Sequence, residues 1–205
     1  MITTQKTTQL KYLLTYENNK LKRQFIFDLP VSQDICGRLC QGCYALKAQV
    51  RFPTTVMPSR IAKYEASLKP DFTQQIINEL TNTKKRYNYV RVHSAGEFYS
   101  QEYLNKWVDI ATAMPNITFY AFTKRLKDFD FNVLKSLPNF VVINSQQFGD
   151  LNYGPVKEIL ELEKAAKTFA CPSTLPFDTN TICGITCNYC MTKTAQTNGV
   201  LFVKH

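Results

Sequence analysis

The chain has 205 residues, of which 44% are hydrophobic and 13% aromatic, so it is long and apolar enough to bury a core of its own. No run of about 18 apolar residues and no leader-like N-terminal pattern is present, so we expect a cytoplasmic protein without a membrane partner. The formal net charge of +9 would suit nucleic acid, but the basic residues stand in short, scattered runs typical of solvated faces, so nucleic acid is not the favoured partner.

The first half of the chain is predicted to begin with one strand and continue with helices. Residues 24–29 form an apolar stretch that Pro30 ends, which is typical of a strand that feeds a loop. The segments that follow place apolar residues on one helical face, with a break around Pro53 and Pro58. Helices are therefore expected over residues 43–49, 60–68 and 70–80.

In the second half of the chain, segments with the hydrophobic pattern of a strand alternate with segments that have the pattern of a helix. Strands are expected over residues 89–93, 117–122 and 140–143, and helices over residues 103–111, 133–137 and 156–169. Such alternation is the signature of successive βα units. Over residues 1–170 we therefore expect an α/β domain, built as a parallel sheet or a partial (β/α) barrel. Ligands of such sheets bind at the carboxyl ends of the strands, where residues 36–43 and 94–97 fall.

Seven cysteines fall into two tight groups along the chain. An odd number in such groups, without an export signal, argues against disulfides and for metal ligation. The first group is Cys36, Cys40 and Cys43, and three thiolates leave one coordination position for another ligand. The second group supplies four thiolates, which is a closed shell. Its members are Cys171, Cys183, Cys187 and Cys190. Thiolates suit iron and zinc alike, so a [4Fe–4S] cluster and zinc both remain open at either site.

Residues 171–205 are expected to form a small cysteine-rich, metal-binding module packed on the α/β domain. This segment is rich in Cys, Thr and Asn and has little regular periodicity before residues 200–205. Loops of this composition rely on a bound metal to hold their shape.

Polar residues near the ends of the predicted strands allow two interpretations each. His93 is either a ligand that completes the first site or, more often for a histidine at a strand end, a hydrogen-bonded structural residue. Arg91 either binds a carboxylate or points to solvent. Glu97 either accepts a bound ammonium group or begins the next helix, where the helix dipole favours a carboxylate. Trp107 is expected in the core.

The loop C-x3-C-x2-C directly after a first strand resembles the cluster loop of the radical S-adenosylmethionine (SAM) superfamily. The resemblance covers roughly residues 24–145 and implies that Cys36, Cys40 and Cys43 hold a [4Fe–4S] cluster whose fourth iron takes the amino and carboxylate groups of SAM. It also implies that Gly96 and Glu97 stand where that superfamily contacts the SAM amino group. The usual aromatic residue before the last cysteine is absent here, whereas the second group has it, which leaves that group as an alternative SAM site.

A second set of motifs is similar to the gene-product-88-like family of phages and mobile elements. The motifs are CYALKA with a following PSR, then VRVHSAGEFYSQEYLNKW, FYAFTK and a cysteine-rich tail. That resemblance implies a metal-bearing protein without naming a reaction. Two functions therefore follow. One is an iron–sulfur protein that cleaves SAM to start radical chemistry on an unknown substrate, and the alternative is a metal-stabilised phage or plasmid protein that contacts nucleic acid or a host protein.

Overall fold

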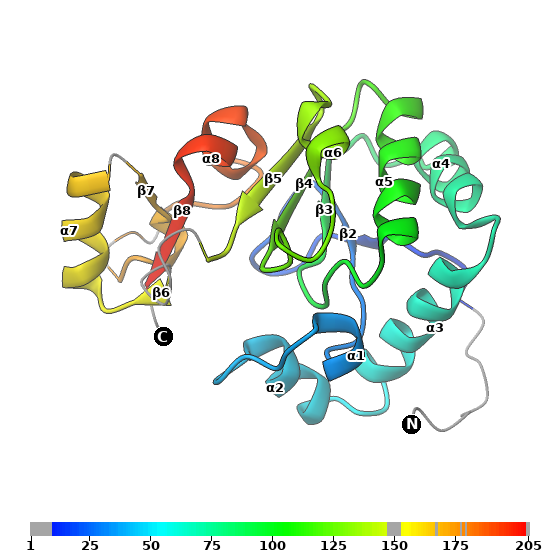
Figure 1. Cartoon of the computed structure of the whole chain (residues 1–205), viewed down its shortest axis with the longest axis horizontal. Helices are drawn as coiled ribbons and strands as arrows, with labels where there is room; N and C mark the ends of the chain where they lie inside the picture. Colours follow the sequence, from blue (N-terminus) through cyan, green and yellow to red (C-terminus); the bar gives the residue numbers. More distant parts are fainter. Residues whose placement is uncertain (1–9, 147–152, 167, 177, 179, 204–205) are drawn as a thin grey trace.

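A computed structural model describes residues 10–146, 153–166, 168–176, 178 and 180–203. Its centre is a five-stranded sheet with the strand order β1-β2-β3-β4-β5 (Figure 1). Strand β1 runs antiparallel to β2, and all the other neighbours are parallel. The strands are β1 (Thr15–Tyr16), β2 (Phe25–Phe27), β3 (Tyr89–Val92), β4 (Thr118–Thr123) and β5 (Phe140–Asn144). The sheet is thus mostly parallel, as predicted. Because β1 and β5 stand at opposite edges, the described strands close no barrel.

Helices cover one face of this sheet and enclose the main core (Figure 1). Side chains alternate along a strand, so Phe25, Val90, Phe119 and Phe140 point to this same face. Trp107 is fully buried among them, as the sequence predicted. The helices of this layer are α3 (Val56–Leu68), α4 (Phe72–Asn82), α5 (Gln101–Ala113) and α6 (Asn132–Ser136).

The C-terminal segment packs on the opposite face of the sheet. Tyr120, Val141 and Ile143 point to this face and contact Met191 and Val200. Beyond β5 the chain forms a second, three-stranded sheet with the order β6-β8-β7 (Figure 1). The elements of the chain beyond β5 are β6 (Tyr153–Gly154), α7 (Val156–Ala166), β7 (Phe169–Ala170), the 3₁₀ turns η2 (Pro172–Thr174) and η3 (Tyr189–Met191), α8 (Lys193–Asn198) and β8 (Val200–Val203).

The structure confirms the predicted helices and strands and corrects several of their limits. Helix α3 begins at Val56, before Pro58, because a proline in the first helical turn removes an N–H that has no partner there. Helix α7 ends at Ala166, and Phe169 belongs to β7 instead. Strands β1, β6 and β7 and helices α1 (Gln33–Cys36) and α8 were not predicted, since segments of two to six residues carry too little periodicity.

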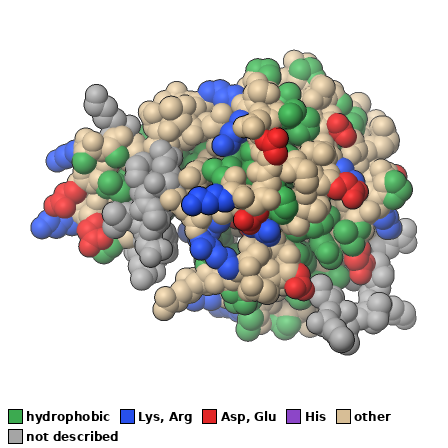
Figure 2. All heavy atoms as spheres, in the orientation of Figure 1, with side chains coloured by type: hydrophobic (Ala, Val, Ile, Leu, Met, Phe, Trp, Pro, Cys, Tyr) green, Lys and Arg blue, Asp and Glu red, His purple; other side chains and the backbone are tan. Residues whose placement is uncertain are grey.

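The surface shows basic residues spread among neutral ones. In Figure 2, Lys and Arg side chains are scattered over this face, and several lie near its middle, where the carboxyl ends of the strands approach α1 and α2 (Tyr44–Arg51). Acidic side chains lie between and around them. Within the described part of the chain, no helix has the length and apolar character needed to cross a membrane.

Candidate functional site

The first cysteine group lies at the carboxyl ends of the parallel strands, as predicted. The chain leaves β2 and forms the short helix α1, whose last residue is Cys36. Gly37 ends this helix with a φ of 72°, a left-handed conformation that suits glycine. Cys43 caps helix α2, and its Sγ accepts a hydrogen bond from the Leu46 N–H at 3.4 Å. The three cysteines are thus carried by one loop between two short helices.

The three thiols of this loop lie in one electrostatic neighbourhood. Burial, with smaller contributions from the charges of Glu97, Cys43 and Cys40, raises the pKa of the Cys36 thiol to about 11. None of these cysteines forms a disulfide. As thiolates these side chains would repel each other, and a bound cation would stabilise that charged form.

Two cations from the end of β4 reach this loop. Lys124 donates from Nζ to Cys40 Sγ at 3.1 Å, and Arg125 donates from its guanidinium to the Ile35 carbonyl at 3.1 Å. In the sequence, Lys124 and Arg125 belong to one of the scattered basic runs. Their position directly after the predicted third strand was the available signal, because the carboxyl ends of parallel strands meet at one edge.

Glu97 joins the β3 loop to the end of β4. Its Oε2 accepts a hydrogen bond from Thr123 Oγ1 at 2.8 Å, and its Oε1 accepts one from the Lys124 N–H at 2.9 Å. Burial raises the pKa of Glu97 to about 7, while these hydrogen bonds and the nearby cations act in the opposite direction. The carboxylate therefore lies near the cysteine loop, as the resemblance to radical SAM enzymes implies, with both of its oxygens engaged.

His93 and Arg91 both have partners within the fold. His93 is buried, and its Nε2 lies 2.8 Å from the Tyr103 hydroxyl. Burial lowers the pKa of His93 to about 3, so the ring is neutral. The structure thus favours the structural interpretation of His93. The Arg91 guanidinium lies over the rings of Phe122 and Tyr120, 4.2 Å and 5.0 Å from their centroids, which neither sequence interpretation included.

An open hollow of about 460 Å³ adjoins the first cysteine loop. Lys47 and Arg51 lie on α2 one helical turn apart and line it together with Cys40 and Cys43. The remaining lining residues are Gly42, Leu46 and Val50. The hollow therefore offers cationic groups and an apolar wall directly beside the thiols.

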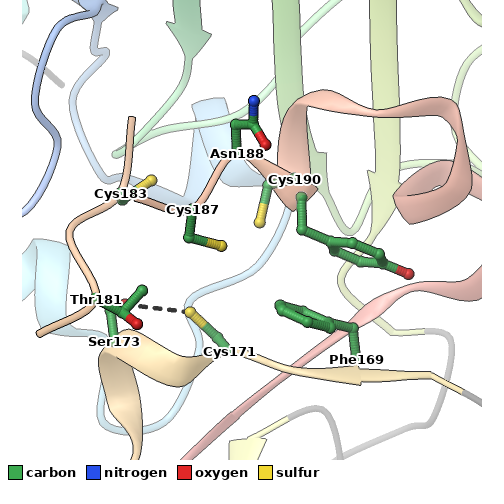
Figure 3. Close-up of a pocket in the computed structure, with 9 residues that line it drawn as sticks. Phe169, Cys171, Ser173, Thr181, Cys183, Cys187, Asn188 and Cys190 are labelled. Atoms are coloured by element: carbon green, nitrogen blue, oxygen red, sulfur yellow. Dashed lines mark hydrogen bonds between the residues drawn. The ribbon is translucent and has the colours of Figure 1, made fainter. Parts of the chain in front are cut away.

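The second cysteine group lines an enclosed pocket of about 20 Å³ (Figure 3). Figure 3 shows Cys187 and Cys190 from one segment approaching Cys171 from another, with Cys183 beside them. The rings of Phe169 and Tyr189 stack at 4.0 Å and form one wall. The structure thus brings together four cysteines that the sequence separates by as many as 19 positions, from 171 to 190.

The fit of either group to a metal rests on its donor chemistry. As placed, no three Cys, His, Asp or Glu side chains of the described residues form a set that could hold a metal ion. Among the described residues, no Asp, Glu or His lines the hollow beside the first loop or the small pocket, so the cysteine sulfurs are the metal donors that each offers. Soft thiolate donors are those that iron–sulfur clusters and zinc take. The cysteines of both sites therefore fit an iron–sulfur cluster or zinc by the type of donor atom.

Replacing Gly96 by alanine is expected to lower the free energy of unfolding by about 3 kcal/mol. Gly96 has a φ of 83°, and a Cβ there would lie 2.5 Å from Leu29 Cβ, so the variant suffers both backbone strain and a clash. Urea unfolding with chelator and reductant measures the change. Gly42→Ala is the matched control, because its φ is 69° but no atom lies within 4 Å of its added Cβ, and it should cost only about 1 kcal/mol. Equal losses would contradict the clash.

Comparison with known proteins identifies one family. The sequence profile of the gene product 88 family matches residues 5–153, which include the first cysteine loop, Gly96, Glu97 and the end of β4. No curated protein and no solved structure matches the chain. The resemblance to the radical SAM superfamily stays a prediction, whereas the resemblance to the gene product 88 family is confirmed. This chain belongs to the gene product 88 family.

Proposed function

We propose that this chain is an iron–sulfur protein in which Cys36, Cys40 and Cys43 hold a [4Fe–4S] cluster with one iron left open to SAM. The observation that carries the proposal is that the open hollow beside the loop is lined by Cys40 and Cys43 and, among the described residues, by no Asp, Glu or His. A structural site would be closed by a fourth side chain, whereas a site that binds a ligand keeps a position free.

The candidates for that fourth position are engaged elsewhere. His93 faces α5 and bonds to Tyr103, so its ring lies in the core. Both Glu97 oxygens accept hydrogen bonds from the end of β4. The side chain that touches Cys40 is Lys124, and an ammonium group has no lone pair to offer a metal. These three contacts support an open coordination position.

The surrounding charges suit both the cluster and an amino-acid ligand. Lys124 and Arg125 offset the negative charge of thiolates held in the loop. Lys47 and Arg51 line the adjoining hollow and are able to bind a carboxylate. Glu97 is the nearby group of opposite sign and suits an ammonium group, as the resemblance implies. When bound, the cluster and SAM would supply the electron and the carbon radical that removes hydrogen from a substrate.

The first test is the metal and acid-labile sulfide content of protein purified and reconstituted without oxygen. We expect iron, sulfide and a broad visible absorption that shifts when SAM is added. Cys36→Ala should remove the SAM-dependent shift, and Cys171→Ala is the matched control that should retain it. Zinc without sulfide at the first loop, unchanged by SAM, would overturn the proposal and favour the alternative, a metal-stabilised protein that contacts nucleic acid or a host protein.

Replacing Lys124 by methionine is expected to shift the midpoint potential of the cluster in the negative direction, on the order of tens of millivolts. The Nζ cation lies 3.1 Å from Cys40 Sγ, and a positive charge there favours the reduced, more negative cluster. Redox titration followed by visible absorption measures the shift. Lys127→Met is the control, because Lys127 is exposed on the same turn. Equal potentials in the two variants would show that Lys124 does not act on the cluster.

A further inference from the structure

We propose that the small pocket of Cys171, Cys183, Cys187 and Cys190 binds a single Zn²⁺ ion, with Arg91 as its counter-charge, and that this ion fastens the C-terminal segment to the open face of the main sheet. The proposal concerns a different group of cysteines and does not rest on the proposed function. Three features carry it, namely the anchored backbone, the size of the pocket and the charge beneath it.

Backbone hydrogen bonds fix the segments that carry these cysteines. The Cys171 N–H donates to the Leu201 carbonyl at 2.8 Å, which ties the first segment to β8. The Cys183 carbonyl accepts from the Lys22 N–H at 3.0 Å, which ties the second segment to the chain before β2. Residues from both ends of the chain thus meet at the pocket.

Gly184 keeps the second segment in this position. Its φ is 85°, and a Cβ at this residue would lie 2.0 Å from the Lys22 carbonyl oxygen. The Gly184 N–H also donates to the Cys187 carbonyl at 2.9 Å, which closes the loop between two of the cysteines. The backbone is therefore built before any metal binds. The thiols do not form a ligand set as placed, so binding requires rotation about Cα–Cβ bonds while the backbone stays fixed.

The size of the pocket selects one ion over a cluster. Its volume is about 20 Å³, against about 460 Å³ for the hollow beside the first loop. A cavity of about 10–15 Å³ on this scale holds one water molecule, so the pocket has room for a single ion. A cluster of four irons and four sulfides would require the walls to separate, including the stacked rings of Phe169 and Tyr189.

Arg91 supplies the charge that such a site needs. Zn²⁺ with four thiolates carries a net negative charge, and no Lys or Arg lines the pocket itself. Arg91 lies on β3 beneath the C-terminal segment, and its guanidinium lies 5.0 Å from the ring centroid of Tyr120. Cys183 and Cys190 pack against the core cluster to which Tyr120 belongs. The Arg91 Nε is buried without a hydrogen-bond partner, although its guanidinium lies over two aromatic rings. Arg91 is half-buried and forms no ion pair with an acidic side chain of the described residues, so an anionic site nearby would stabilise it.

The position of the pocket gives the ion a structural role. Met191 directly follows Cys190 and packs with Ala195 and Val200 against Tyr120 and Val141 of the main sheet. These contacts form a small core, and the ion would add the free energy of metal binding to the free energy of folding. The ion would then stabilise the position of the segment on the sheet face.

The test is metal analysis of the full chain in which Cys36, Cys40 and Cys43 are all replaced by alanine. Removing the first group separates this proposal from the proposed function, since any metal retained belongs to the second group. After growth and reconstitution with both iron and zinc, we expect one zinc per chain and no acid-labile sulfide. Adding Cys187→Ser should remove the zinc. Retained iron with sulfide, or no bound metal, would overturn the proposal.

A second measurement remains informative if the Cys187→Ser variant fails to fold. Arg91→Met is expected to weaken zinc binding about tenfold in a chelator competition, whereas Arg91→Lys should keep the affinity of the unmodified chain. Arg86→Met is the matched control, because Arg86 is exposed just before β3. If Arg91→Met and Arg86→Met bind zinc equally well, Arg91 is not the counter-charge.

Discussion

As the pH rises from about 4.5 to 7, the free energy of unfolding of the unmodified protein is expected to fall by about 3 kcal/mol because of Glu97, and Glu97→Gln is expected to abolish this fall. Burial raises the pKa of Glu97 from 4.5 to about 7, so the folded protein holds this proton more tightly than the unfolded chain. The contribution to stability is fully present below pH 4.5, declines as the pH rises through this window and is lost above pH 7. Urea unfolding at several pH values, with chelator and reductant, measures the difference between the two profiles.

Glu102→Gln is the matched control for this prediction. Glu102 lies on α5 with its side chain 80% exposed, where it pairs with Lys106 at 3.2 Å. The same change of chemistry at this exposed position should leave the pH profile of the unmodified protein intact. A Glu97→Gln profile parallel to that of the unmodified protein would show that the carboxyl is not held in its protonated form by burial.

Replacing Trp107 by alanine is expected to lower the free energy of unfolding by about 4 kcal/mol. Trp107 is fully buried, and its ring makes edge contacts with Phe27, Phe72 and Phe119, at centroid distances of 5.4, 5.9 and 6.3 Å. The substitution removes these contacts and leaves a cavity between α5 and the sheet, which fixed neighbouring strands fill only in part. The urea midpoint of unfolding measures the loss.

The control for the Trp107 variant is Val133→Ala on helix α6. Val133 is 56% exposed, so its truncation should change the free energy of unfolding by no more than about 0.5 kcal/mol. Comparable losses in the two variants would contradict the position of Trp107 at the centre of the core.

The alternating pattern of the sequence determined the main sheet and the helices on its face. Strand runs such as residues 117–122 and helical stripes such as residues 103–111 are local signals, and local hydrophobic periodicity reflects which face of an element is buried. The same reasoning placed the first cysteine loop and Glu97 at one edge, because parallel strands direct their carboxyl ends to the same side. These parts of the fold could therefore be predicted from the sequence alone.

The partners of the charged side chains depended on the tertiary structure. Lys124 meets Cys40 across 84 positions of the sequence, and no local pattern records that distance. Arg91 alternates with apolar neighbours, which left its direction open, and it lies over aromatic rings because it is in register with Tyr120 on the neighbouring strand β4. Glu97 bonds to the end of β4 because register brings β3 and β4 side by side.

The sequence by itself determined the two groups of cysteines, the α/β order of the elements and the edge of the sheet at which the first cysteine loop lies. The sequence grouped Cys171 with the other three C-terminal cysteines, but only the tertiary structure showed the small pocket that they line and decided that β6, β7 and β8 form a second sheet. The physical reason is that two-residue strands and distant thiols gain stability only from contacts between remote segments. Such contacts have no period along the chain, so they become visible only once the chain is folded.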